Sequence, residues 1–327
     1  MRVVIVGAGM SGLVAAHELT AAGVDVAVVD KGRSVGGRLA TRRIGDARLD
    51  HGAQFFTVRT PAFQRRVDDW MERGIVHVWN HGFDAATDAG SGDGHPRYVA
   101  TAGMNSLAKD LAAGLDGTSC SIETSTMAFT VRPSNAPTDG SSGWDVVIDD
   151  ASVRSGDAVI LTSPLPQSLA LLVDSGVEMD STLMRTEYDR TIGLLVTLDG
   201  PSAIPETGGV NDGDDVFSFI GDNRAKGISA AEAVTFHANP EWSEAHWNDD
   251  DTLLELLGAE AQRWLGDASI IEAQVKKWRL ATPRSIWPDP CWVSAGGRIV
   301  MAGDAFAGPK VEGAHNSGLA AAHALLD

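Results

Sequence analysis

The feature that most constrains this chain is a glycine pattern, GxGxxG, that follows an apolar run at the N-terminus. The run Arg2–Val6 predicts a buried strand, and the Ala-rich amphipathic stretch after the glycines predicts a helix. Gly7 makes the tight turn from strand to helix, Gly9 lets a pyrophosphate approach the backbone, and Gly12 lets the helix lie close to the sheet. The free N–H groups at the start of the helix attract phosphate. The pattern therefore predicts a dinucleotide-binding unit of the Rossmann type.

A second strand and an acidic residue complete this unit. The apolar run Asp25–Val29 ends at Asp30, whose carboxylate can accept hydrogen bonds from both hydroxyls of an adenosine ribose and would repel a 2′-phosphate. Further contacts to the dinucleotide are predicted for the flanking residues Ala8, Met10, Ser11 and Lys31.

Two other segments favour a tightly held FAD over a nicotinamide cofactor. Gly36-Gly37-Arg38 can wrap the same pyrophosphate, with Arg38 as counter-charge. Near the other end of the chain, Arg298–Ala302 predicts a strand that ends at Gly303-Asp304, and Ala314–Leu326 predicts a closing helix. A simple nicotinamide dehydrogenase needs neither the second pyrophosphate loop nor the Gly-Asp pair. Asp304 is expected to reach the ribityl chain or the pyrophosphate.

The composition limits the function classes that remain. The chain has 327 residues, enough for one large or two modest domains, and its net charge of −18 disfavours nucleic acid and anionic membranes as partners. No apolar run approaches the roughly 20 residues of a membrane span. The two cysteines, Cys120 and Cys291, indicate neither a disulfide framework nor a metal site, which fits a reducing cytoplasm.

The pattern of apolar residues predicts a discontinuous α/β protein. We expect an FAD-binding domain made of residues 1–75, 98–173 and 276–327, and a substrate domain made of residues 76–97 and 174–275 with a mixed or antiparallel sheet. Residues 80–97 are expected to form a loop, and the chain to re-enter the FAD domain by Lys277–Arg279. The other expected strands are Met127–Val131, Trp144–Ile148, Asp157–Thr162, Thr191–Leu198, Val216–Ile220 and Ala233–His237. The other expected helices are Pro61–Arg73, Met104–Leu115, Pro166–Val173 and Thr252–Leu265.

The N-terminal glycines, the GGR loop and the C-terminal GD…EGA segment resemble those of the FAD-dependent amine oxidase superfamily. That resemblance implies a glutathione-reductase-like FAD-binding Rossmann domain. The segment LDHGAQFFT, Leu49–Thr57, is similar to that of renalases, especially bacterial ones. Asn223-Arg224, His237…Trp242-Ser243, Trp278-Arg279…Pro283 and Lys310–Ala314 share this similarity. The chain departs from the pattern at Ala305-Phe306, where an aromatic residue is usual after the Gly-Asp pair, and at Lys310, where arginine is common.

The resemblance, together with the motifs above, predicts a set of cofactor contacts. Gln54 and Phe55 are candidates to line the flavin ring, and the backbone N–H groups of Glu312-Gly313-Ala314 can stabilise negative charge near flavin N1. Cys291 lacks the spacing of a covalent flavin attachment, so we expect noncovalent FAD. The complete predicted set is Gly7, Ala8, Gly9, Met10, Ser11, Gly12, Asp30, Lys31, Gly37, Arg38, Gln54, Phe55, Gly303, Asp304, Val311, Glu312 and Ala314.

A renalase-like enzyme would oxidise 2- and 6-dihydro isomers of NAD(P)H to NAD(P)+, with O2 reduced to H2O2. The candidate substrate-pocket residues are Asn223, Arg224, His237, Trp242, Trp278 and Lys310, with no catalytic residue assigned. The alternative is an amine oxidase or a desaturase-like flavin dehydrogenase that acts on an apolar substrate. Paired tyrosines usually frame the amine in such oxidases, and this chain has only Tyr98 and Tyr188. A flavin-binding module without enzymatic activity is a third possibility.

Overall fold

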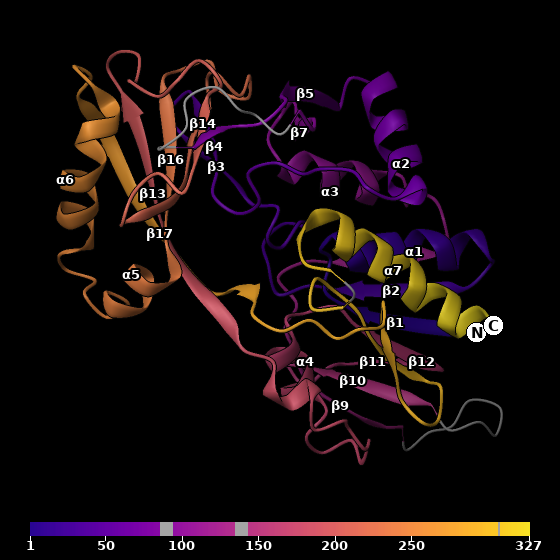
Figure 1. Cartoon of the computed structure of the whole chain (residues 1–327). Coiled ribbons are helices and arrows are strands. Elements are labelled where there is room, and N and C mark those ends of the chain that lie inside the picture. The colour runs from indigo at the N-terminus through magenta and orange to yellow at the C-terminus, as the bar shows by residue number, and fades with distance from the viewer. Residues whose placement is uncertain (86–93, 135–142, 307) are drawn as a thin grey trace. The chain divides into compact units, whose positions relative to one another are not determined.

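The computed structural model describes residues 1–85, 94–134, 143–306 and 308–327, and the chain forms two compact units (Figure 1). The first unit contains residues Met1–Arg38, Leu107–Glu187 and Pro283–Asp327. The second contains residues Leu39–Ser106 and Tyr188–Thr282. Both units are therefore discontinuous in sequence.

The first unit is built on a six-stranded sheet with the order β18-β19-β12-β1-β2-β8. All of its strands are parallel except β18, which runs antiparallel to β19. The strands are β1 (Arg2–Val6), β2 (Asp25–Val29), β8 (Cys120–Glu123), β12 (Ala158–Leu161), β18 (Trp292–Val293) and β19 (Ile299–Met301). The central strands are continuous apolar runs because both faces of the sheet are covered, as is usual for parallel sheets.

Two layers cover this sheet (Figure 1). The helices α1 (Met10–Ala21) and α7 (Lys310–Leu326) lie together on one face. Their close approach needs Gly318, because a Cβ at this position would collide with the backbone of Ser11. On the other face lies an antiparallel sheet of β9 (Ala128–Pro133), β10 (Trp144–Ile148) and β11 (Val153–Gly156). The helix α3 (Asn105–Ala113) precedes β8 in sequence, and the helix α4 (Leu165–Leu171) and the 3-10 helix η1 (Leu183–Arg185) follow β12.

The second unit has a mixed six-stranded sheet, β17-β13-β16-β15-β14-β6. Its strands are β6 (Asp84–Ala85), β13 (Tyr188–Leu198), β14 (Gly209–Asn211), β15 (Phe217–Asp222), β16 (Ala233–Ala238) and β17 (Ile270–Pro283, whose last residue belongs to the first unit). The helices α5 (Pro240–Ala245) and α6 (Leu253–Leu265) cover one face, over a core that contains Phe217, Phe236 and Leu257.

The hairpin of β3 (Thr41–Ile44) and β4 (Ala47–Asp50) packs on the opposite face of this sheet through Leu49 and Leu195. The strands β5 (Val76–Asn80) and β7 (Arg97–Ala100) form a separate antiparallel pair, and α2 (Pro61–Glu72) buries Phe63 and Trp70. The expected helix from Pro61 is therefore present. Proline suits the first helical position because it lacks an N–H, and an N–H there would have no acceptor within the helix.

The predicted strands and helices are present in the structure, with shifted ends. The largest shift is at α7, which begins at Lys310 instead of Ala314. The expected return at Lys277–Arg279 is wrong, because β17 carries those residues as a strand of the second sheet. The structure also places residues 39–75 in the second unit, where the sequence suggested the first, because the β3–β4 hairpin packs on the second sheet. Of the expected loop 80–97, residues 86–93 lie outside the described residues, and 84–85 form β6.

Candidate cofactor and active site

The turn between β1 and α1 has the geometry that pyrophosphate binding needs. Gly7 has φ of 111° and donates its N–H to the Val29 carbonyl at 2.8 Å. A Cβ on Gly12 would collide with the Gly7 carbonyl oxygen. By contrast, a Cβ on Gly9 would meet no atom within 4 Å. Gly9 is the N-cap residue of α1, so no capping side chain bonds to the first N–H groups of the helix. Open space therefore adjoins the N–H groups at the start of α1, and these residues fit a pyrophosphate.

The second glycine loop lies beside the first turn. Gly36 donates its N–H to the Ala8 carbonyl at 2.8 Å, and a Cβ on Gly37 would lie 3.8 Å from the Gly9 Cα. Both glycines have positive φ, 122° and 53°. Gly36 and Gly37 thus approach the same region as the start of α1, which is the arrangement that a loop wrapping the same pyrophosphate requires.

Asp30 holds two backbone segments together at the end of β2. Its Oδ2 accepts the Ala8 N–H and its Oδ1 accepts the Gly32 N–H, each at 2.6 Å. A carboxylate has about four acceptor sites, so these bonds leave capacity for ribose hydroxyls. Lys31 is exposed and donates to the Gln167 side chain at 3.1 Å. Its contact with a cofactor stays a prediction.

Arg38 and Asp304, both predicted to contact FAD, contact each other in the structure. The guanidinium makes a bidentate ion pair with the carboxylate, at 2.6 and 2.7 Å, and the side chains are 28% and 14% exposed. Next to them, the Gly303 N–H donates to the buried Ser317 hydroxyl at 2.9 Å. The pair orients Arg38 and offsets part of its charge.

The start of α7 supplies a second set of N–H groups. Val311, Glu312 and Ala314 lie within its first turns, not before the helix, because it begins at Lys310. The first four N–H groups of a helix have no acceptor within the helix, and here these groups belong to Lys310–Gly313. The Ser11 hydroxyl donates to the Ala314 carbonyl at 2.5 Å and ties α7 to α1.

The second unit contains a fully buried ion pair that sequence reasoning missed. Lys226 Nζ lies 3.5 Å from Asp50 Oδ2 and donates to Gln54 Oε1 at 3.0 Å, and both charged side chains are 0% exposed. The ammonium also lies over the Trp79 ring, 5.2 Å from its centroid. Asp50 Oδ1 accepts the Thr41 hydroxyl at 2.6 Å, and the Met104 N–H donates to the same oxygen at 2.9 Å.

A hydrogen-bond network connects this pair to other predicted site residues. Gln54 Nε2 donates to the Asp50 carbonyl at 2.7 Å and lies 3.5 Å from His237 Nε2. Asn223 is buried, accepts the Asp50 N–H at 3.3 Å and donates to the Thr235 hydroxyl at 3.0 Å. In the structure, Asn223 therefore links the Asp50 backbone to the Thr235 side chain by hydrogen bonds.

Burial controls the protonation of this region. Desolvation raises the pKa of Asp50 and lowers that of Lys226, and their mutual attraction opposes both shifts. Burial, followed by the charge of Lys226, lowers the pKa of His237 to about 4. Burial, followed by the charges of Lys276 and Arg42, lowers that of His51 to about 4. Both imidazoles are therefore neutral at pH 7.

Aromatic side chains surround the network within the second unit. Trp278 stacks on His51, with ring centroids 5.4 Å apart, and its indole N–H donates to the His51 carbonyl at 2.6 Å. Phe55 contacts Phe83 at 5.0 Å and Phe219 at 5.7 Å between centroids. Four residues, Phe55, Trp79, Phe83 and Phe219, form a mutually contacting aromatic cluster.

Two other predicted pocket residues of the second unit, Trp242 and Arg224, are not brought to this network. Trp242 packs against the core beneath α5 and α6, and its ring lies against His246. Arg224 is exposed and pairs with Glu232 at 3.2 Å. Lys310 is an exposed residue of the first unit. Asp50 and His51 lie inside the renalase-like segment, so a sequence signal pointed to them. Lys226 follows Asn223-Arg224 closely, but only its burial in the structure identifies it as part of the network.

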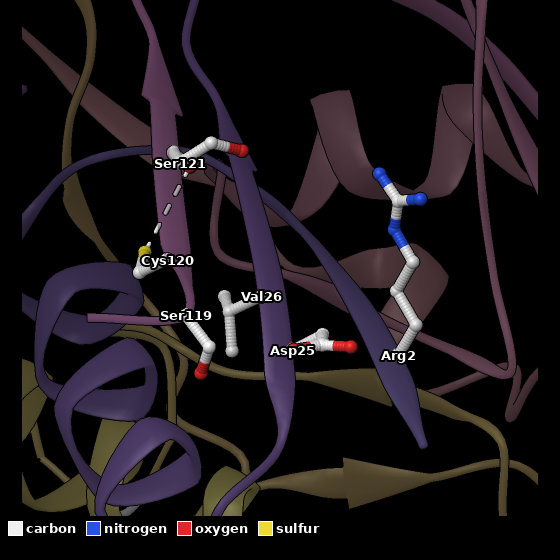
Figure 2. A pocket seen from close by; sticks show the side chains of 6 residues that line it. All are labelled: Arg2, Asp25, Val26, Ser119, Cys120 and Ser121. Carbon is white, nitrogen blue, oxygen red and sulfur yellow. Dashed lines mark hydrogen bonds between the residues drawn. The ribbon is translucent and has the colours of Figure 1, made fainter. Parts of the chain in front are cut away.

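The first unit also has an open pocket of about 320 Å³, whose lining side chains Figure 2 shows. Its lining residues are Arg2, Asp25, Val26, Ser119, Cys120 and Ser121. They surround the amino ends of β1, β2 and β8, whereas ligands of such sheets bind beyond the carboxyl ends. Burial raises the pKa of the Cys120 thiol to about 11, so the thiol is protonated at neutral pH.

Two family models match the chain. One for an NAD(P)-binding Rossmann-like domain matches residues 5–72, and one for flavin-containing amine oxidoreductases matches residues 85–326. The chain belongs to the flavin-containing amine oxidoreductase family. Membership confirms the prediction of an FAD-dependent oxidoreductase. No helix in the described ranges is both long and apolar enough to cross a bilayer.

Individual relatives differ in how much of the chain they match. Rice polyamine oxidase 1 is 54% identical over 55 residues, which is 16% of this chain and 11% of that protein. Mouse renalase is 28% identical over 181 residues, which is 53% of this chain and 50% of renalase. These matches thus span between about a tenth and half of the relatives' length. The solved structure of putrescine oxidase bound to putrescine superimposes on this chain with a TM-score of 0.72 at 15% identity. The match covers 100% of this chain and 99% of the putrescine oxidase chain, which shows a shared fold.

Proposed function

We propose that the protein is a renalase-like oxidase with a glutathione-reductase-like FAD fold. Its substrates are the 2- and 6-dihydronicotinamide isomers of NAD(P)H, and the overall reaction converts the isomer, O2 and H+ into NAD(P)+ and H2O2. FAD would supply the hydride acceptor and, on reoxidation, the electrons for O2. The open start of α1, the Gly36-Gly37 loop and the start of α7 would hold its phosphates and its reduced ring.

The similarity to mouse renalase carries this proposal, because it extends over 181 residues. The neutral state of His51 and His237 in the second unit agrees with the proposal. Loss of hydride from a dihydronicotinamide produces an aromatic ring and leaves no proton to remove, so the reaction needs no general base. His51 and His237 are neutral and largely enclosed, and His237 lies within reach of the Gln54 amide. Such groups can position a flat neutral ring by hydrogen bonds.

An amine oxidase or a desaturase-like dehydrogenase is the second candidate. The family name, the similarity to rice polyamine oxidase 1 and the cluster around Phe55 and Phe219 favour it, since apolar chains and amines both bind aromatic surfaces. The tyrosines argue against a paired cage. Tyr98 is buried and stacks on Phe56 with centroids 5.6 Å apart.

Anaerobic reduction of the flavin distinguishes the candidates. The FAD-loaded protein is mixed with the 2- and 6-dihydro isomers, with ordinary 4-dihydro NADH, and with putrescine and spermidine, and the visible flavin absorbance is followed. We expect rapid bleaching by the two isomers and none by the other compounds. Rapid bleaching by an amine, with none by the isomers, would establish the second candidate instead.

The same preparation tests noncovalent FAD binding. Acid precipitation should release the flavin into the supernatant, because neither cysteine has the sequence context of an attachment site. Flavin that stays in the precipitated protein would contradict this expectation.

A further inference from the structure

One face of β17 carries a row of polar and aromatic side chains. Gln274, Lys276 and Trp278 alternate along the strand and so share this face. The residues between them, Val275 on one side of Lys276 and Lys277 on the other, point the opposite way, and Val275 packs against the core under α6. The row therefore lies on the face of the sheet that the β3–β4 hairpin covers.

The hairpin contacts both ends of this row. Arg42 of β3 donates through Nε to Gln274 Oε1 at 3.2 Å. His51, which follows β4, stacks on Trp278 and accepts its indole N–H at the backbone carbonyl. Lys276 lies between these two contacts, about 7 Å along the strand from each neighbour in the row.

The charges at this place are not compensated. Within the described ranges, the Lys276 ammonium makes no ion pair or hydrogen bond, and Arg42 makes only the bond to Gln274. Burial and the nearby Arg42 lower the pKa of Lys276, and burial, followed by both cations, lowers that of His51. The acid on the same row, Glu272, is exposed and accepts a hydrogen bond from Gln274 at 3.1 Å.

Arg42 is exposed and Lys276 is half-buried, and two cations at one place, in a chain whose net charge is −18, attract an anion. We propose that Arg42 and Lys276 form an anion subsite that binds a phosphate group of the nucleotide substrate. This inference rests on the proposed function, since a dihydronicotinamide nucleotide carries such a phosphate and an amine does not. A guanidinium on β3 and an ammonium on the same row of β17 as its partner Gln274 can both donate to phosphate oxygens.

Ligands that bind without turnover test the subsite directly. Nicotinamide mononucleotide has one phosphate, and nicotinamide riboside has the same ring and sugar without it. Their dissociation constants for the FAD-loaded protein are measured by calorimetry. We expect the wild type to bind the mononucleotide about 10-fold more tightly, because charge-assisted hydrogen bonds are worth roughly this factor or more. Salt should weaken binding of the mononucleotide and leave the riboside almost unaffected.

Two variants and a matched control locate the effect. Lys276→Gln and Arg42→Gln should each bring the ratio of the two dissociation constants close to one, without changing that of the riboside. Arg43→Gln removes the same charge from the neighbouring position on the other side of β3, so the ratio should persist. Lys276→Arg should retain the preference. This variant serves as the comparison if Lys276→Gln loses FAD or melts early.

Three results would overturn the subsite: no binding of the mononucleotide, equal binding of both ligands by the wild type, or a preference that survives both glutamine substitutions. Failure of the proposed function looks different. In that case the dihydro isomers would not bleach the flavin, while the phosphate preference could still depend on Lys276 and Arg42.

Discussion

Replacing Lys226 with methionine should destabilise the second unit strongly, since the buried Asp50 carboxylate would lose its counter-charge, and its pKa, already raised by desolvation, would rise further. Methionine approximates the length of the lysine chain and fills the space against Trp79. The hydroxyl of Thr41 and the N–H of Met104 would still solvate one carboxylate oxygen. The other oxygen would lose its cation.

The size of the effect follows from the geometry. At the observed separation of 3.5 Å, the attraction is about 5 kcal/mol for an effective dielectric constant of about 20. Desolvation of both groups opposes this attraction, so the net value of the pair is small, whereas removal of one partner costs about 3–5 kcal/mol. The double variant Asp50→Asn/Lys226→Met leaves no buried charge. We therefore expect it to be more stable than the sum of the single effects predicts, by about 2–4 kcal/mol.

Urea unfolding of the FAD-saturated proteins, followed by tryptophan fluorescence, measures the four free energies of this cycle. Lys277→Met is a suitable control because it removes a lysine from a more exposed pair, in which Nζ lies 2.6 Å from Asp250 and over the Trp247 ring. That change should cost about 1 kcal/mol or less. Additive effects of the Asp50 and Lys226 substitutions would refute the reasoning, because additivity means that the two charges do not interact.

Two further predictions concern cofactor binding and pH. Gly9→Ala should give a folded protein that binds FAD weakly, because its Cβ meets no protein atom but enters the space beside the start of α1, whereas Gly12→Ala should fold poorly. Flavin content and melting temperature separate the two outcomes. Normal flavin content in Gly9→Ala would contradict the phosphate site. The free energy of unfolding should fall as pH decreases from about 6.5 to about 4, since the unfolded chain protonates His51 and His237 while the folded protein does not. His237→Gln should reduce this slope by up to about 1.4 kcal/mol per pH unit, and an unchanged slope would mean that His237 is charged in the folded protein.

The first unit was the more predictable part of the fold. Gly7, Gly9 and Gly12 each have a local steric reason that sequence spacing reveals, and the structure confirms the strand, turn and helix around them. The sequence also predicted a second loop beside the first, and Gly36 lies there. The pairing of Arg38 with Asp304 was missed because 266 residues separate the two, and each alone reads as a cofactor contact.

The site in the second unit depends on long-range burial, which residue patterns do not encode. Lys226 is typical of an exposed turn in the sequence, yet it is fully buried because Asp50, Gln54 and the Trp79 ring surround its ammonium. Trp242 shows the opposite case. It stands five residues after His237, but the strand ends at Ala238 and α5 carries Trp242 to the other face of the sheet.

Function in this unit therefore depends on which face of the sheet a residue occupies. Along β17, Lys276 and Lys277 are adjacent and chemically identical, but alternation sends them to opposite faces. Lys277 pairs with Asp250, whereas Lys276 faces Arg42 and the stacked His51 without an acidic partner in the described part of the chain. A composition count treats the two lysines alike. The sheet separates a structural ion pair from a cation that is available to a ligand, which is why the anion subsite becomes visible only once the strand register is known.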